Sequence, residues 1–386
     1  MAATHATNRR TAEADDEVVR TCQDLIRFDT SNYGDDRGPV ERAAAEYVAG
    51  RLTDCGLAPV IVESAPGRAS VVARWAGADP TRPGLLVHGH LDVVPAHADD
   101  WAVDPFAGEV RDGYLWGRGA VDMKDMLAMV LTVVRNWTAV GRRPPRDVVL
   151  AFLADEESGG LRGAQWLVDH HPELFEGVSE AISEVGGFSV TVRGRRLYTV
   201  QTAEKGIAWM RLSATGRAGH GSMTNPDNAV LHLADAMTRL GRHEWPLAWS
   251  PTLQALVATV AEQAGIRGRP EEVLDEVLAQ LGPFAAMILP TLTHSTTPTM
   301  LEAGDKVNVV PRRAVGAVDG RFLPGRRAEF FAEVDRLVGA HVHREEIVTL
   351  DGLEAPFDTP LVAAMRQALS VADPDAVTVP YMLSGG

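Results

Sequence analysis

Hydrophobic positions divide the first half of the chain into segments with helical spacing and short continuous apolar runs. The segments in which apolar residues recur every three or four positions are residues 17–28, 40–52, 126–137 and 163–170. The continuous apolar runs between them are residues 84–87, 147–154 and 181–183. Strands that alternate with helices in this way indicate an α/β fold, with a mostly parallel mixed sheet flanked by helices.

The pattern changes after about residue 203. Residues 209–214 alternate between apolar and polar positions, which predicts a strand with one buried face. Helices are predicted at residues 229–240 and 328–337, and strands at residues 307–310 and 315–322. These elements indicate a smaller α+β domain. Residues 245–299 show helical spacing and look like an insertion, to which the sequence assigns no role.

Each of the three apolar runs is followed by side chains that can bind a metal ion. His90 and Asp92 follow the first run, Glu156 and Glu157 the second, and Glu184 the third. Ligands of open α/β sheets bind beyond the carboxyl ends of the strands, so we expect these side chains to lie close together. A single strand that ends in an acid or a histidine is commonplace, whereas three such ends favour a metal centre.

Two features of this set also have plainer interpretations. Asp122 follows a glycine-containing turn and precedes a predicted helix, so it can be a helix N-cap. The adjacent Glu156 and Glu157 can be a solvated acidic turn, or one can bind metal while the other acts as a base.

Three sequence blocks carry a family resemblance. They are His88-Gly89-His90-Leu91-Asp92-Val93-Val94-Pro95, Gly117-Arg118-Gly119-Ala120-Val121-Asp122-Met123-Lys124 and Asp155-Glu156-Glu157. In this order they resemble the signature blocks of the co-catalytic di-zinc metallopeptidases and amidohydrolases. That family includes aminoacylase, glutamate carboxypeptidase, acetylornithine deacetylase and succinyl-diaminopimelate desuccinylase. The similarity covers essentially the whole chain, and it implies a zinc-peptidase fold with an inserted lid and dimerisation domain.

The resemblance implies a role for each candidate ligand. His90 and Glu184 would bind one zinc ion, and Asp122 would bridge two zinc ions, with a cis peptide bond to Met123. Glu157 would bind the second zinc ion, and Glu156 would be the general base. Co²⁺ or Mn²⁺ can substitute for zinc in such sites. Asp92 would hydrogen-bond the far nitrogen of His90 and fix its tautomer.

The resemblance extends into the smaller domain. The block Gly216-Arg217-Ala218-Gly219-His220-Gly221-Ser222 resembles the lid motif, in which His220 would reach the opposing subunit and stabilise an oxyanion. Asn308 and Arg321 lie in two further matching blocks and are expected to contact substrate. The planar fork of Arg321 suits a carboxylate, although an ordinary surface ion pair explains it as well.

The domain limits expected from these matches are residues 1–203 and 346–386 for the catalytic domain and 204–345 for the lid and dimerisation domain. In the family, the run that ends here at Gly386 continues to a final histidine that completes the second zinc site. We therefore expect an incomplete second part of the catalytic domain, an incomplete second zinc site and uncertain activity of this chain.

Composition indicates which partners and which cellular location to expect. The chain carries 37 Lys and Arg against 52 Asp and Glu, a formal charge of −15, which argues against nucleic acid as a partner. We expect no membrane-spanning segment and no signal peptide. Cys22 and Cys55 cannot make a disulfide framework, so a cytoplasmic location is expected.

The expected function is zinc-dependent hydrolysis of an amide bond in a small N-acyl amino acid or dipeptide-like substrate with a free carboxylate, by a homodimer. The alternatives are an esterase or amidase that needs no free carboxylate, and an inactive metal-binding homologue that acts by ligand binding or dimerisation. The sequence does not identify the acyl group or the amino acid.

Overall fold

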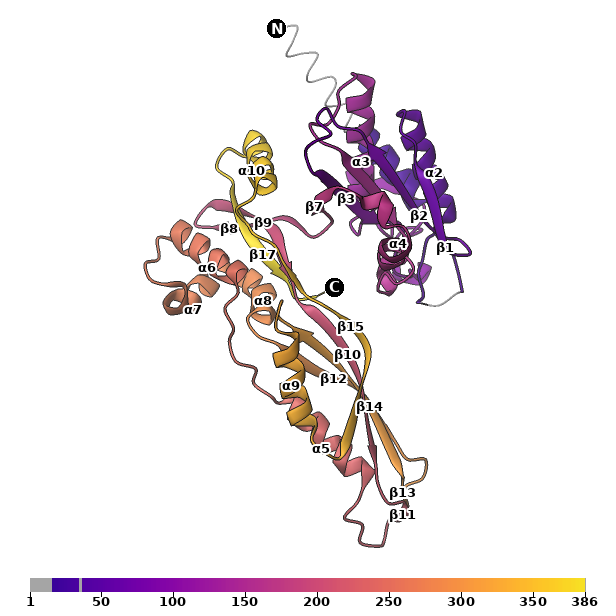
Figure 1. The fold of residues 1–386 in the computed structure, drawn as a ribbon, viewed down its shortest axis with the longest axis vertical. Coiled ribbons are helices and arrows are strands. Elements are labelled where there is room, and N and C mark those ends of the chain that lie inside the picture. Colours follow the sequence, from indigo (N-terminus) through magenta and orange to yellow (C-terminus); the bar gives the residue numbers. More distant parts are fainter. Residues whose placement is uncertain (1–15, 35–36, 386) are drawn as a thin grey trace. The chain divides into compact units, whose positions relative to one another are not determined.

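The computed structural model describes residues 16–34 and 37–385. These residues form two compact units, one that ends at Glu184 and one that begins at Val185 (Figure 1). The limits expected at residues 203 and 345 for a lid and dimerisation domain stay a prediction.

A five-stranded sheet with the order β1-β2-β6-β3-β7 forms the centre of the first unit. The strands are β1 (Val60–Ala65), β2 (Arg68–Trp75), β3 (Gly84–His90), β6 (Val148–Leu153) and β7 (Val178–Ile182). Pairing is antiparallel from β1 through β6 and parallel among β6, β3 and β7. The sheet is therefore mixed, as expected, and its parallel part consists of the three strands that precede the candidate ligands.

Helices cover both faces of this sheet (Figure 1). Residues 16–26 are helical, and with α2 (Arg42–Asp54) and α3 (Lys124–Ala139) they bury one apolar cluster that includes Leu25, Val48 and Leu127. On the other face, Leu167 of α4 (Ala164–His170) packs against Val149 and Ala151. The predicted helices and apolar runs of this region are confirmed to within a few residues. Smaller elements are β4 (Glu109–Arg111), β5 (Tyr114–Trp116), η1 (Ala98–Asp100), η2 (Glu156–Ser158) and η3 (Pro172–Phe175).

The second unit contains an antiparallel sheet with the order β12-β14-β10-β15. Its strands are β10 (Gly206–Thr215), β12 (Ser295–Ala303), β14 (Arg313–Phe322) and β15 (Val342–Leu350). Burial alternates along β14, because α5 (Ala229–Gly241) and α9 (Arg327–Val338) cover one face and share its core. The alternation predicted at residues 209–214 is confirmed within β10. Next to this sheet, β11 (Gly219–His220) pairs with β13 (Val309–Val310).

A second sheet in this unit joins segments that lie far apart in the sequence. In it, β9 (Arg195–Glu204) pairs with β8 (Gly186–Val192), with β16 (Leu353–Glu354) and, in parallel, with β17 (Val377–Leu383). The segment that the sequence left without a role covers this sheet: α6 (Pro251–Ala264) and α7 (Pro270–Leu281) share an apolar core with Leu197 and Tyr381. The remaining helical elements are η4 (Gly282–Phe284), α8 (Ala285–Ile288), η5 (Leu289–Thr291) and α10 (Pro360–Ala372).

One helical run in the described residues is long and apolar enough, by length and composition alone, to cross a membrane. It covers Pro270–Thr291, 22 residues whose best window has a mean hydropathy of 1.3. In the structure, Val273, Val277 and Leu281 of this run are buried in the same apolar core as α6 and β17. We therefore assign the run to the core of the second unit.

Candidate metal centre

The candidate ligands lie where the parallel strands of the first unit end. His90 is the last residue of β3, Glu156 and Glu157 follow β6 in η2, and Glu184 follows β7. The carboxyl ends of parallel strands meet at one edge of a sheet, so the pairing of β3 with both β6 and β7 brings these side chains together. Asp122 reaches the same edge from the turn before α3, and its peptide bond to Met123 is cis, as the resemblance implied.

His90, Asp122 and Glu184 form a compact cluster. The Nε2 atom of His90 is 3.0 Å from Oδ1 of Asp122 and 3.2 Å from Oε2 of Glu184. One ligand atom from each residue lies within 4.8 Å of the other two. An imidazole with two carboxylates is a donor set that zinc accepts.

Two observations show that this cluster fits a divalent cation. Oε2 of Glu184 is buried and has no hydrogen-bond partner among the described residues. The ring of His90 is 2% exposed, and its Nδ1–H donates to the backbone carbonyl of Asp92 at 2.9 Å. Because a carbonyl oxygen only accepts, this bond keeps a proton on Nδ1, so that Nε2, which faces the acids, is the nitrogen that would bind a metal ion when the ring is neutral.

The charges in the cluster shift the pKa values of its members. Burial alone would lower the pKa of His90, but the carboxylates of Asp122, Asp92 and Glu184 beside its ring raise it well above its ordinary value. The hydrogen bond with His90 lowers the pKa of Asp122. Three carboxylates around one imidazole leave an excess of negative charge, to which a divalent cation is complementary.

The two glutamates after β6 differ in their surroundings. Oε2 of Glu156 lies 3.8 Å from Nε2 of His90, and its side chain is half exposed. Partial burial, together with the nearby acids Glu184, Glu157 and Asp92, raises the pKa of Glu156 to about 7, and His90 opposes this shift. Oε1 of Glu157 accepts a hydrogen bond from the backbone N–H of Val94 at 3.1 Å. The structure thus places Glu156 beside the cluster and turns Glu157 toward Val94.

Asp92 contacts both His90 and the turn that carries Glu156 and Glu157. Its carboxylate lies 3.5 Å from Nδ1 of His90, while its own backbone carbonyl accepts the shorter bond from that nitrogen. The carboxylate accepts hydrogen bonds from the backbone N–H groups of Glu156 and Glu157, each at 3.1 Å. The expected link between Asp92 and His90 therefore runs mainly through the backbone, and the carboxylate holds the turn that carries the two glutamates.

The three candidate residues of the second unit fall into two places. Nε2 of His220 lies 3.5 Å from Nδ2 of Asn308, and both residues are exposed. The backbone N–H of Ser222 donates to Nδ1 of His220 at 3.3 Å, and the hydroxyl of Ser222 lies 2.8 Å from the same nitrogen. Arg321 lies elsewhere, on β14, where its Nε and Nη2 atoms donate to the two oxygens of Asp319 at 2.8 and 3.1 Å.

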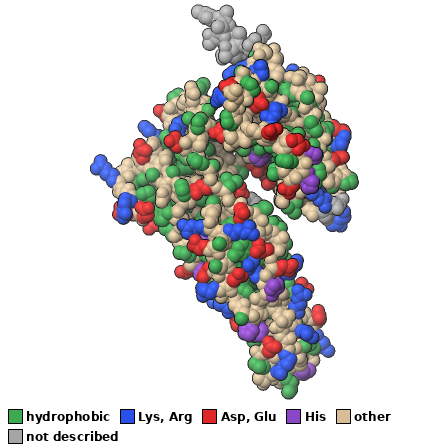
Figure 2. Space-filling model, viewed as in Figure 1, with side chains coloured by type: hydrophobic (Ala, Val, Ile, Leu, Met, Phe, Trp, Pro, Cys, Tyr) green, Lys and Arg blue, Asp and Glu red, His purple; other side chains and the backbone are tan. Residues whose placement is uncertain are grey.

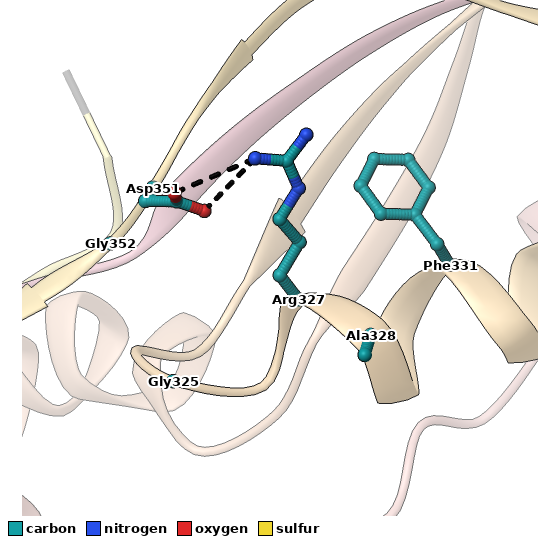
Figure 3. Close-up of a pocket in the computed structure, with 6 residues that line it drawn as sticks. All are labelled: Gly325, Arg327, Ala328, Phe331, Asp351 and Gly352. Atoms are coloured by element: carbon teal, nitrogen blue, oxygen red, sulfur yellow. Dashed lines mark hydrogen bonds and ion pairs between the residues drawn. The ribbon is translucent and has the colours of Figure 1, made fainter.

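The second unit also has an open cavity of about 550 Å³ beside the start of α9 (Figure 3). It is lined by Gly325, Arg327, Ala328, Phe331, Asp351 and Gly352. Arg327 lies 3.4 Å from Asp351 across it. None of the candidate catalytic or ligating residues lines this cavity, so we do not assign it to the reaction.

Comparison with known proteins identifies the family. Residues 86–385 match the model of the peptidase family M20/M25/M40. The chain belongs to this family. Aminoacylase-1 of Sus scrofa is 30% identical over 292 residues, which are 75% of this chain and 63% of that protein. The chain spans between about half and two thirds of the length of the curated relatives that it matches.

Solved structures of M20 proteins share the fold. An M20 family metallo-carboxypeptidase from Sulfolobus solfataricus superposes with a TM-score of 0.68 at 16% identity, covering 96% of this chain and 86% of that one. A dinuclear metal-binding peptidase of the same family from Bacillus subtilis superposes with a TM-score of 0.60 at 13% identity, covering 97% and 84%. The zinc-peptidase fold expected from the sequence is thereby confirmed.

The sequence assigned no role to two buried residues beside the M20 centre, Asn32 and Asp155. Asn32 lies in the segment between the first helix and α2, and its amide contacts the carboxylates of Asp92 and Asp155. Asp155 directly precedes Glu156 and has a positive φ of 66°, which is uncommon for a residue other than glycine. A polar residue after a helix is an ordinary loop signal, so nothing in the local sequence singled out Asn32.

Proposed function

We propose that this protein is a zinc-dependent hydrolase of amide bonds in small N-acyl amino acids or dipeptide-like substrates. One observation carries the proposal: the cluster of His90, Asp122 and Glu184 lies beside Glu156, whose pKa is raised to about 7. A general base works best when its pKa is close to the operating pH. This arrangement supports an active enzyme rather than an inactive metal-binding homologue.

Two zinc ions are proposed, in line with the dinuclear relative. His90 and Glu184 would hold one ion, Asp122 would bridge, and Glu157 would contribute to the second site after leaving the N–H of Val94. Together the ions would supply polarisation of the substrate carbonyl and a lowered pKa for the attacking water.

In this proposal, Glu156 transfers the proton. Its carboxylate accepts a proton from the water that attacks the carbonyl carbon, and it then donates that proton to the nitrogen of the leaving amine. Asp92 keeps this carboxylate in place, because its own side chain accepts the backbone N–H of Glu156. The half-exposed side chain of Glu156 allows access for both the water and the substrate.

Substrates with a free carboxylate are proposed because of Arg321. Asp319 holds two nitrogens of its guanidinium, which fixes the plane of the fork. The relatives include an aminoacylase and a probable carboxypeptidase S-like protein from Dictyostelium discoideum, names that are consistent with small carboxylated amides. Asn308, next to His220, is proposed as a further substrate contact.

We further propose a homodimer in which His220 of one subunit donates a hydrogen bond to the oxyanion formed in the other. The proposal is supported by the exposed position of His220, whose Nδ1 contacts Ser222. The elements between residues 204 and 345, chiefly the sheet built on β10 and β14, would be the lid and dimerisation domain. The free cysteines Cys22 and Cys55 support a cytoplasmic location. On the face shown in Figure 2, basic side chains are interspersed with acidic ones.

A substrate panel tests the proposal. The zinc-loaded protein is assayed for release of free amine from N-acetyl-, N-succinyl- and N-carbamoyl-amino acids and from dipeptides. We expect hydrolysis of at least one class, abolished by a chelator and restored by Zn²⁺. Hydrolysis of esters alone, or amide hydrolysis that survives complete metal removal, would contradict the proposal.

A further inference from the structure

The amide of Asn32 lies between two buried carboxylates. Its Nδ2 donates to Oδ2 of Asp92 at 2.9 Å and to Oδ1 of Asp155 at 3.2 Å. Asn32, Asp92 and Asp155 are 4%, 0% and 5% exposed. Because ionised carboxylates only accept hydrogen bonds, this contact also fixes which end of the amide is the nitrogen.

The other end of the amide is equally occupied. Oδ1 of Asn32 accepts the backbone N–H of Gly34 at 3.0 Å and lies 3.4 Å from Nη2 of Arg68. Arg68 in turn donates through Nη1 to Oε1 of the fully buried Glu41 at 2.6 Å. All the hydrogen-bonding capacity of the amide is therefore used, and a chain of polar contacts leads from Glu41 to the turn at the metal centre.

Both carboxylates that Asn32 joins hold the turn after β6. Asp92 accepts the backbone N–H groups of Glu156 and Glu157. Asp155 accepts the backbone N–H of Arg162 at 2.9 Å through its other oxygen. Asn32 is itself anchored to the loop after His90, because its backbone N–H donates to the carbonyl of Val93 at 2.8 Å.

The chemistry of this bridge requires a neutral double donor. Two buried carboxylates repel each other and each loses hydration, so each needs a donor. An amide NH₂ supplies one hydrogen to each acid without adding charge. Aspartate at position 32 would have the same shape, but it would remove both donors and place a third carboxylate in the same buried space.

We propose that Asn32 is a positioning residue for the metal centre. Asn32 joins Asp92 to Asp155, and Asp92 accepts the backbone N–H groups of Glu156 and Glu157. Asn32 thereby fixes the distances of these two glutamates from His90. This role rests on the proposed function in assigning Glu156 as the base and Glu157 as a ligand.

The test compares three substitutions with a matched control. The variants are Asn32→Ala, Asn32→Asp and Asn32→Ser, of which Ser retains one donor. The control is Thr132→Val, because Thr132 is 3% exposed in the same unit and its hydroxyl has no partner among the described residues. For each protein we would measure kcat, KM, Zn²⁺ affinity by chelator competition and the melting temperature.

The proposal predicts an order of damage. Asn32→Ala should lower kcat and the affinity of the more weakly held Zn²⁺ by about 10–100-fold, as outer-shell partners of metal ligands do, with KM changed less than about threefold. Asn32→Ser should lie between wild type and Ala, and the isosteric Asn32→Asp should be the most damaged. Thr132→Val should stay within about twofold of wild type.

Two outcomes overturn the proposal. The first is a loss of kcat and Zn²⁺ affinity in Asn32→Ala that is no greater than the loss in Thr132→Val, when the melting temperatures of both variants fall equally. The other is an Asp variant better than Ala, which would mean that position 32 only fills space. If Asn32→Asp does not fold, the order of Ser and Ala decides in its place.

The metal measurement separates this inference from the proposed function. A wild-type protein that hydrolyses no amide, but whose Zn²⁺ affinity falls in the Asn32 variants and not in the control, would remove the proposed function and support the positioning role. Amide hydrolysis that the Asn32 substitutions leave unchanged would support the proposed function and contradict the positioning role.

Discussion

The carboxylate of Asp92 accepts a hydrogen bond from the backbone N–H of Glu156 at 3.1 Å. Its second oxygen accepts the next N–H along the chain, that of Glu157, at the same distance. One buried side chain thus links the loop after His90 to the turn that carries both glutamates, so the spacing between the proposed ligands and the base depends on it.

Replacing Asp92 by Asn should weaken metal binding without disturbing the tautomer of His90. The backbone carbonyl of residue 92, which accepts from Nδ1, is unchanged, but one of the two acceptor oxygens becomes a donor. One N–H of the turn then loses its partner, and we expect a loss of about 10–100-fold in Zn²⁺ affinity. Chelator competition measures this, and an affinity equal to that of wild type would show that the turn is held without Asp92.

Replacing Arg321 by Lys should penalise substrates with a free carboxylate. Lysine keeps the charge and loses the planar fork that Asp319 holds in place. Hydrogen bonds to charged groups contribute about 1.5–3 kcal/mol, so kcat/KM should fall roughly 10–100-fold. The control is the C-terminal amide of the same substrate, which should be cleaved poorly by both proteins. Equal cleavage of acid and amide by wild type would remove the carboxylate requirement.

Replacing His220 by Ala should lower kcat by about 10²–10³-fold with a smaller change in KM, because an oxyanion donor acts mainly in the transition state. If His220 works across a dimer, mixing this variant with Glu156→Gln should restore part of the activity. Subunit exchange is verified with differently tagged chains, and exchange without recovery would place His220 in its own subunit's reaction or outside it.

His294 should make the second unit less stable in acid. Burial, and to a lesser degree Lys205 and Arg326, lower its pKa from 6.5 to about 4. The unfolded chain therefore binds a proton that the folded chain does not, so stability is complete above about pH 6.5 and is lost as the pH falls toward 4. The shift corresponds to roughly 3 kcal/mol in all, of which about 2 kcal/mol is lost by pH 5.

Urea unfolding at pH 7.5 and pH 5 checks this with the variant His294→Asn, whose side-chain oxygen can replace Nδ1 as the acceptor for the N–H of Leu323. The variant should lose about 2 kcal/mol less than wild type between the two pH values. The exposed His343, replaced by Asn, is the control and should leave the pH dependence unchanged. An identical slope in wild type and His294→Asn would show that His294 is not the group responsible.

Local sequence patterns predicted those elements whose burial is decided by their own residues. The apolar run at residues 147–154 became β6 (Val148–Leu153), and the alternation at residues 209–214 lies within β10. Because parallel strands end at one edge, the same runs also predicted that His90 and Glu184 would meet. The contribution of Asp122 came from the family resemblance, since an N-cap explained it equally well from the residues alone.

Long-range contacts were not predictable in this way. The pairing of β17 with β9 joins segments more than a hundred residues apart. The sequence of a strand does not indicate which other strand it pairs with. The role of residues 251–281 depended on that sheet and was equally hidden. Asn32 escaped notice for the same reason, because its two partners, Asp92 and Asp155, belong to distant segments.

The central claim is that Glu156 moves the proton in a reaction at a metal centre formed by His90, Asp122 and Glu184. The measurement that tests it is the turnover number of Glu156→Gln at a metal content matched to wild type, determined by mass spectrometry after dialysis. The account predicts unchanged bound zinc and a kcat lowered by about 10²–10⁴-fold, whereas Asp122→Ala should lose metal as well. A Gln variant within a few-fold of wild-type kcat, at equal zinc content, would contradict the account.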